Sequence, residues 1–185
     1  MMATYEYVSQ SEHDARPWVG PQIYDQDGEL VWSGAPTFKG YNIKDFKMSK
    51  VNGVDMLSGV WTHDHVEMLM DNNYKIYKKL HAAQDPGVSL NIHGFNTVDN
   101  GTLALAMILR QGAASKEESA RVGFDGKCRV TFPGFEVYNT TTWERIFYWD
   151  AEDKIHLDEV YVPSNCKGRW DYLSVMACAE SFEIC

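Results

Sequence analysis

The sequence predicts an all-β protein built from consecutive antiparallel hairpins. Aromatic residues make up 13% of the 185 residues and stand in short runs bounded by Gly, Asn and Asp, a composition typical of strands and turns. Several segments alternate polar and apolar residues with the period of an extended strand. Two of these alternating segments are followed by Asn-Gly, at 52–53 and 100–101, the dipeptide that most readily takes the positive φ angles of a tight hairpin. A chain of this length is long enough for one domain with a sizeable core.

The clearest hairpin lies within Ser89–Leu109. Along its first strand Ile92, Gly94, Asn96 and Val98 alternate with His93, Phe95 and Thr97. The turn Asp99-Asn100-Gly101 follows, and Leu103–Leu109 is an apolar return strand. Because His93 is the imidazole carried within this hairpin, we expect any chemistry of the protein to lie near it.

Other strands are expected on both sides of this hairpin. In chain order they are Gln22–Tyr24, Glu29–Trp32, Asn42–Ser49, Val54–Trp61, Val66–Met70, Tyr74–Leu80, Cys128–Phe132, Gly134–Tyr138, Trp143–Trp149, Leu157–Val162 and a last one from Trp170. Residues 111–127 are polar, and Ser115–Arg121 within them is predicted as a short helix. We expect residues 1–17 to form a flexible arm, residues 18–173 the domain, and residues 174–185 a divergent tail.

Charge and composition exclude several classes of partner. The net charge is −9 and the sequence has no cluster of Lys or Arg, so nucleic acid is not an expected partner. No apolar run approaches the ~20 residues that span a bilayer, and the N-terminus lacks the apolar centre of a signal peptide, which leaves the compartment open. The four cysteines show no Cys-x-x-Cys spacing, so neither a zinc ribbon nor a redox pair is indicated.

The hairpins repeat along the chain. Phe46 and Phe95 are 49 positions apart, and the two Asn-Gly turns are 48 apart. This period is near the roughly 40–50 residues of a β-propeller blade, which has four antiparallel strands. The chain holds about two and a half such blades, whereas propellers have roughly four or more. We therefore expect a homodimer in which a second copy completes the ring.

In these segments the chain resembles the arylsulfotransferase family, specifically a fungal-type branch that is similar to bacterial aryl-sulfate sulfotransferases. The resemblance is carried by GPQIYDQDGELVWSG (20–34), NIKDFKM (42–48), THDHVEMLMDNNYKIYKKL (62–80), LNIHGFNTVDNGTLAL (90–105), FEVYNTTTWERIFYWDAEDKIHLDEVYV (135–162) and RWDYL (169–173). It implies a six-bladed propeller that transfers a sulfo group from an aryl sulfate to a phenol. The donor is then not a nucleotide, no cofactor is needed, and a histidine carries the sulfo group.

The resemblance also implies roles for individual residues. His93 matches the family's strand-borne histidine in the context His-x-Phe-Asn, which makes it the expected nucleophile. Asn96 is the expected amide donor to the sulfonyl oxygens. Lys44 and Lys154 stand where the family usually has histidine; a lysine keeps a positive charge that binds sulfate but is protonated at neutral pH.

Two further histidines, His63 and His65, match the segment before the outer hairpin and are expected to bind substrate. If His63-Asp64-His65 formed a strand, both imidazoles would share one face, a spacing that also suits Zn, Ni or Cu. We favour loop histidines over a metal site here. His93 and the lysines also have simpler interpretations, as a strand histidine bonded to nearby backbone and as solvated cations. The alternative function is a non-catalytic propeller fragment that binds a ligand or another chain.

Overall fold

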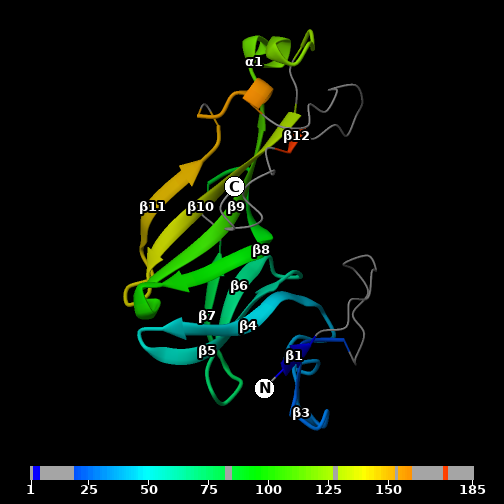
Figure 1. Ribbon diagram of the computed structural model, residues 1–185, viewed down its shortest axis with the longest axis vertical. Coiled ribbons are helices and arrows are strands. Elements are labelled where there is room, and N and C mark those ends of the chain that lie inside the picture. The colour runs from blue at the N-terminus through cyan, green and yellow to red at the C-terminus, as the bar shows by residue number, and fades with distance from the viewer. Residues whose placement is uncertain are drawn as a thin grey trace.

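A computed structural model describes residues 2–4, 19–81, 85–126, 129–152, 154–159 and 173–174. In these ranges strands dominate, joined by one short α-helix and two 3-10 turns, which confirms the predicted all-β class (Figure 1). Most of the expected N-terminal arm and C-terminal tail lies outside the described residues. The last predicted strand is described only at Leu173–Ser174 (β12), which pairs in parallel with Val130 and Thr131.

The antiparallel strands form three sheets, and in each sheet the strands lie in sequence order. Sheet 1 consists of β1 (Met2–Thr4), β2 (Gln22–Tyr24) and β3 (Leu30–Ser33). Sheet 2 consists of β4 (Ile43–Val51), β5 (Val54–Trp61), β6 (Val66–Met70) and β7 (Ile76–His81). Sheet 3 consists of β8 (Val88–Val98), β9 (Leu103–Ala113), β10 (Arg129–Asn139) and β11 (Arg145–Asp150).

The two Asn-Gly dipeptides form turns of different length. Asn52 and Gly53 are the whole connection between β4 and β5, with φ angles of 48° and 79°, as a two-residue turn requires. The β8–β9 loop is longer and contains a 3-10 turn, Asp99–Gly101. All three of its residues have positive φ angles, of which Gly101 has the largest at 82°. The sequence therefore located both hairpins but not the length of the second loop.

Two details of the predicted strands are wrong, one boundary and one strand. The predicted break at Pro133 is absent, because β10 pairs with β9 continuously from Arg129 to Asn139. Its pairing with β11 begins only at Gly134, so Pro133 lies at the edge of the three-stranded part, where a missing N–H is tolerated. Leu157–Glu159 is a 3-10 turn rather than extended chain, and residues 160–162 lie outside the described part.

The predicted helix is present as α1 (Lys116–Arg121). The Ser115 hydroxyl accepts a hydrogen bond from the Glu118 N–H at 3.1 Å and so caps its first turn. The Glu118 carboxylate in turn accepts from the Leu157 N–H at 3.1 Å and bonds the His156 ring. This contact with α1 explains why the chain turns at Leu157 instead of extending.

Sheet 2 is covered on both faces. One face packs with sheet 1 around Phe38, and the other packs against sheet 3 around Phe95. Every residue of β6 is buried for this reason. Because successive strand residues point to opposite faces, Met68 and Met70 belong to the first core whereas Leu69 belongs to the second. Glu67 shares the face of Leu69 and therefore points toward sheet 3.

The first strands of sheets 2 and 3 lie side by side and run in the same direction. Three contacts join β4 to β8, in order along both strands: Asp45 Oδ2 with Phe95 N at 3.3 Å, Lys47 Nζ with Asn96 Oδ1 at 3.2 Å, and Lys50 N with Thr97 Oγ1 at 3.3 Å. A fourth, Asn52 N with Gly101 O at 2.9 Å, joins the turns that follow the two strands. Each contact joins residues 47 to 50 positions apart, close to the spacing of the sequence repeat.

Candidate functional site

Both of these first strands bulge at the same place. Between Lys44 and Lys47, β4 has one residue more than the facing part of β5. Between Leu90 and Phe95, β8 has three residues more than the facing part of β9. Bulges bend a strand and re-aim its side chains, and they are frequent next to active sites. His93 lies within the β8 bulge, which ends at Phe95, and the Phe95 N–H contacts Asp45 in the bulge of β4.

A polar network joins the two bulges. Lys47 Nζ lies 2.7 Å from Asp45 Oδ2 and donates to Asn96 Oδ1 at 3.2 Å. The same Asp45 oxygen accepts the Phe95 N–H. Asp45 itself has a φ of 51°, a conformation that costs a non-glycine residue energy and that these contacts hold in place. Asp45 and Lys47 side chains are 21% and 33% exposed, so the network reaches the surface.

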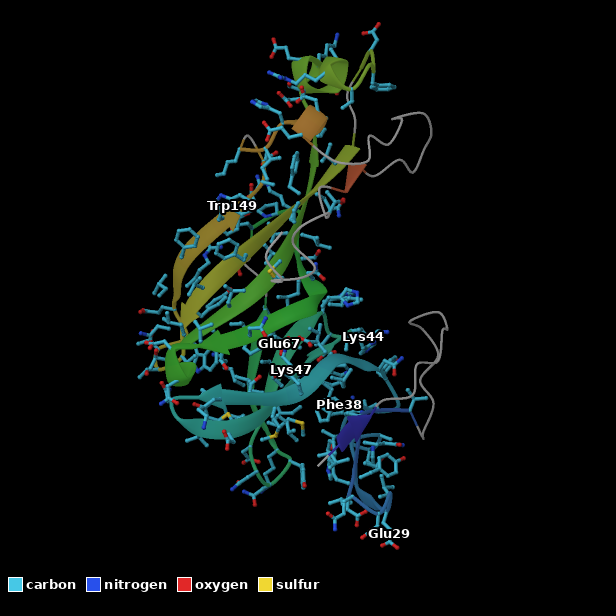
Figure 2. The ribbon with its side chains drawn as sticks, viewed as in Figure 1. Glu29, Phe38, Lys44, Lys47, Glu67 and Trp149 are labelled. Carbon is cyan, nitrogen blue, oxygen red and sulfur yellow. The ribbon has the colours of Figure 1, made fainter. Side chains whose placement is uncertain are left out.

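Beneath this network lies a buried carboxyl group, that of Glu67. Glu67 is 1% exposed, and among the described residues neither of its carboxyl oxygens has a hydrogen-bond partner with full geometry, although the backbone N–H of Gly59 lies close enough to lower its pKa. Burial raises the pKa of Glu67 well above its usual value; the Asp45 carboxylate raises this pKa further, while Lys47 and the Gly59 amide act in the opposite direction. In Figure 2 Glu67 is labelled just above Lys47, with Lys44 to its right at about the same height.

His93 is exposed, and its backbone N–H donates to Asn91 Oδ1 at 3.0 Å. Lys44 is half-buried and precedes His93 by 49 positions, the spacing that relates the contacts between β4 and β8. The two residues therefore occupy matching positions in neighbouring bulged strands. With Asn96, also exposed, three of the six predicted site residues lie on the β4–β8 pair.

The other predicted site residues lie elsewhere. His63 and His65 are exposed in the turn between β5 and β6, so they do not share a strand face. The His63 ring stacks on Tyr41 with centroids 3.9 Å apart. In the described ranges no three His, Cys, Asp or Glu side chains are grouped to hold a metal ion.

Lys154 lies beyond the end of β11. Its ammonium donates to the Glu152 carbonyl at 3.2 Å and lies 3.9 Å from Asp150 Oδ1. Within the residues that the structure describes, no hydrogen bond or ion pair joins Lys154 to β4 or β8. It is thus separate from the network around the two bulges.

Sequence reasoning missed three residues of this site: Asp45 and Lys47 in the polar network, and Glu67 beneath it. Glu67 had a detectable signal, since it is the one charged residue in the otherwise apolar strand Val66–Met70. A buried position for such a residue demands either a partner or a raised pKa, and both outcomes are frequent at functional sites. Asp45 and Lys47 gave no comparable signal, because alternating charges are ordinary on a strand.

No helix in the described part of the chain is long and apolar enough to cross a membrane. Comparisons of the chain with protein-family models, with curated proteins and with solved structures found no match.

Proposed function

We propose that sheets 2 and 3 are successive blades of a β-propeller and that the protein transfers a sulfo group between phenols through His93. The observation that carries this proposal is the alignment of β4 with β8. Each contact joins two residues that are 47 to 50 positions apart, and the contacts follow the same order along both strands. Rotation of one four-stranded unit about an axis produces this relation between the innermost strands of a propeller. The same alignment supports a shared site made by the two bulges.

The proposed sulfo transfer uses side chains on β4 and β8. A neutral His93 ring nitrogen attacks the sulfur of an aryl sulfate, the bond from sulfur to the aryl oxygen breaks, and the phenolate leaves and takes a proton from solvent. A second phenol then attacks the sulfo-histidine, the bond from sulfur to the ring nitrogen breaks, and the phenol gives its proton to solvent. Lys44 supplies a positive charge for the sulfonyl oxygens. Because Asn96 Oδ1 accepts from Lys47, its amide nitrogen is left as a donor on the exposed side.

This function predicts that His93→Ala abolishes sulfo transfer. The assay follows release of 4-nitrophenol from 4-nitrophenyl sulfate with a phenolic acceptor present. Loss of a covalent nucleophile lowers the rate by about 1000-fold or more. The control is His81→Ala, which removes an exposed histidine at the end of β7 and should keep the wild-type rate. A labelled donor should leave its sulfo group on the wild-type protein and not on His93→Ala; wild-type turnover by His93→Ala would refute the proposal.

The second candidate is a non-catalytic module whose ring a second copy completes. The face of sheet 3 that points away from sheet 2 carries Phe135, which contacts Phe147 and Trp149 at centroid distances of 5.5 and 5.8 Å. Phe147 and its neighbour Ile146 are 49% and 57% exposed. Sheet 2 is covered on both faces, whereas in the described part of the chain no sheet packs over this face of sheet 3, so the next sheet in the series would cover it.

This candidate predicts a discrete dimer in light scattering on a sizing column. Phe147→Glu places a charge in the middle of the open face and should shift the protein to the monomer. Tyr77→Glu is the matched control, because Tyr77 is similarly exposed but lies on β7. A wild-type monomer that turns over aryl sulfates would exclude this candidate.

A further inference from the structure

The β8 bulge that carries His93 is held by contacts on both sides of that residue. The pairing of β8 with β9 skips residues 91 to 94, because Leu90 is the last paired residue before them and Phe95 is the first after them. A bulge interrupts the ladder of hydrogen bonds that fixes the rest of a strand. The conformation of this bulge must therefore come from other contacts.

Two of these contacts lie within sheet 3. The buried Asn91 accepts the His93 N–H on its side-chain oxygen at 3.0 Å. Gly94 packs closely on Met107, because a Cβ at Gly94 would lie 2.1 Å from Met107 Cγ. Only glycine lets the bulge approach β9 so closely. The backbone on either side of His93 is therefore fixed, while the His93 side chain is exposed.

The third contact comes from the neighbouring sheet, through Asp45. Its Oδ2 atom accepts the Phe95 N–H at 3.3 Å, two residues beyond His93, and a hydrogen bond from Lys47 Nζ at 2.7 Å. Asp45 directly follows Lys44, and its φ of 51° is one that aspartate and asparagine adopt more readily than other non-glycine residues. The carboxylate thus ties the part of β4 that carries Lys44 to the bulge that carries His93.

We propose that Asp45 is a positioning residue, which holds Lys44 and His93 at a fixed separation for sulfo transfer. The sulfur of a bound aryl sulfate must lie in line with the attacking nitrogen of His93 while its oxygens face the Lys44 ammonium. A misplacement of about 1 Å between groups that act on one reacting centre can cost about 100-fold in rate. Asp45 has this effect without touching the substrate. The inference rests on the proposed function and adds to it the residue that couples its two strands.

The test compares Asp45→Ala with the conservative variant Asp45→Asn. Asparagine keeps a side-chain oxygen for the Phe95 N–H and tolerates the left-handed backbone, whereas alanine does neither. With 4-nitrophenyl sulfate as donor and a phenolic acceptor, Asp45→Ala should lower kcat by about 100-fold and change KM by less than about threefold. Asp45→Asn should recover most of this loss of kcat.

Hydrogen exchange of the Phe95 amide reports the contact independently of activity. Exchange should be faster in Asp45→Ala and close to wild type in Asp45→Asn. Asp99→Ala is the matched control, because Asp99 also has a positive φ, 52°, and its carboxylate also accepts a side-chain hydrogen bond, from Thr102 at 2.7 Å. Asp99 lies in the loop that follows β8, beyond the bulge, so this variant should change neither kcat nor the exchange of Phe95.

The other outcomes separate this inference from the proposed function. Equal losses of kcat in Asp45→Ala and Asp45→Asn would show that the charge of Asp45 matters and its bond to Phe95 does not, which would overturn the inference. A wild-type kcat in Asp45→Ala, or an equal loss in Asp99→Ala, would also overturn it while leaving the proposed function in place. Absence of sulfo transfer by the wild-type protein would refute the proposed function, and this inference with it.

Discussion

Replacing Gly101 by alanine should lower the free energy of unfolding by about 3 kcal/mol or more. Gly101 has a φ of +82°, where alanine is strained by about 1–2 kcal/mol. An added Cβ would also lie 2.2 Å from the carbonyl oxygen of Lys50, which is backbone of the neighbouring sheet. The Gly101 carbonyl accepts hydrogen bonds from the Asn52 N–H and the Thr140 hydroxyl, so any shift of this loop breaks contacts on both sides.

Urea unfolding measures this effect, and Gly28→Ala is its matched control. Gly28 has the same φ of +82°, but no atom lies within 4 Å of its would-be Cβ. Its replacement should therefore cost only the backbone strain, about 1–2 kcal/mol. The difference between the two variants reports the close approach of β4 to the β8–β9 loop. Equal losses would contradict the side-by-side packing of sheets 2 and 3.

The second large effect is a dependence of stability on pH that comes from Glu67. Because its pKa is raised in the folded state, the unfolded chain releases this proton first as the pH rises above about 4.3, the usual value for glutamate. The stabilising contribution is complete below that pH. It is lost by up to about 1.4 kcal/mol for each further pH unit until the pH passes the folded-state pKa.

Urea unfolding of wild type and Glu67→Gln at pH 5, 6, 7 and 8 tests this sign. The wild type should lose stability relative to the variant as the pH rises, because glutamine has no proton to release. Other charged groups around Glu67 stay in place in both proteins, so their titration cancels in the difference. The charged groups that act on Glu67 are Asp45 and Lys47 on β4. A constant difference across this pH range would show that Glu67 is ionised in the folded protein.

The candidate site was only partly predictable. His93, Asn96 and Lys44 were proposed from the sequence, and the structure places them on the same pair of strands. His63 and His65 were compatible with one strand face because they are two positions apart, but the structure places them in the turn between β5 and β6. Lys154 was grouped with the site by resemblance, although its contacts are with Glu152 and Asp150.

By itself the sequence determined the all-β class, the order of the hairpins and the helix capped by Ser115. These features depend on neighbours along the chain: alternation within a strand, positive φ at Asn-Gly, and a hydroxyl at a helix start. Only the tertiary structure decided that β4 lies against β8 and that Glu67 is enclosed between two sheets. The cost of burying a carboxyl depends on what surrounds it in space: Glu67 meets Asp45 and Lys47 only when β4, β5 and β6 pair in sheet 2, and it is enclosed only when sheet 3 packs on that face.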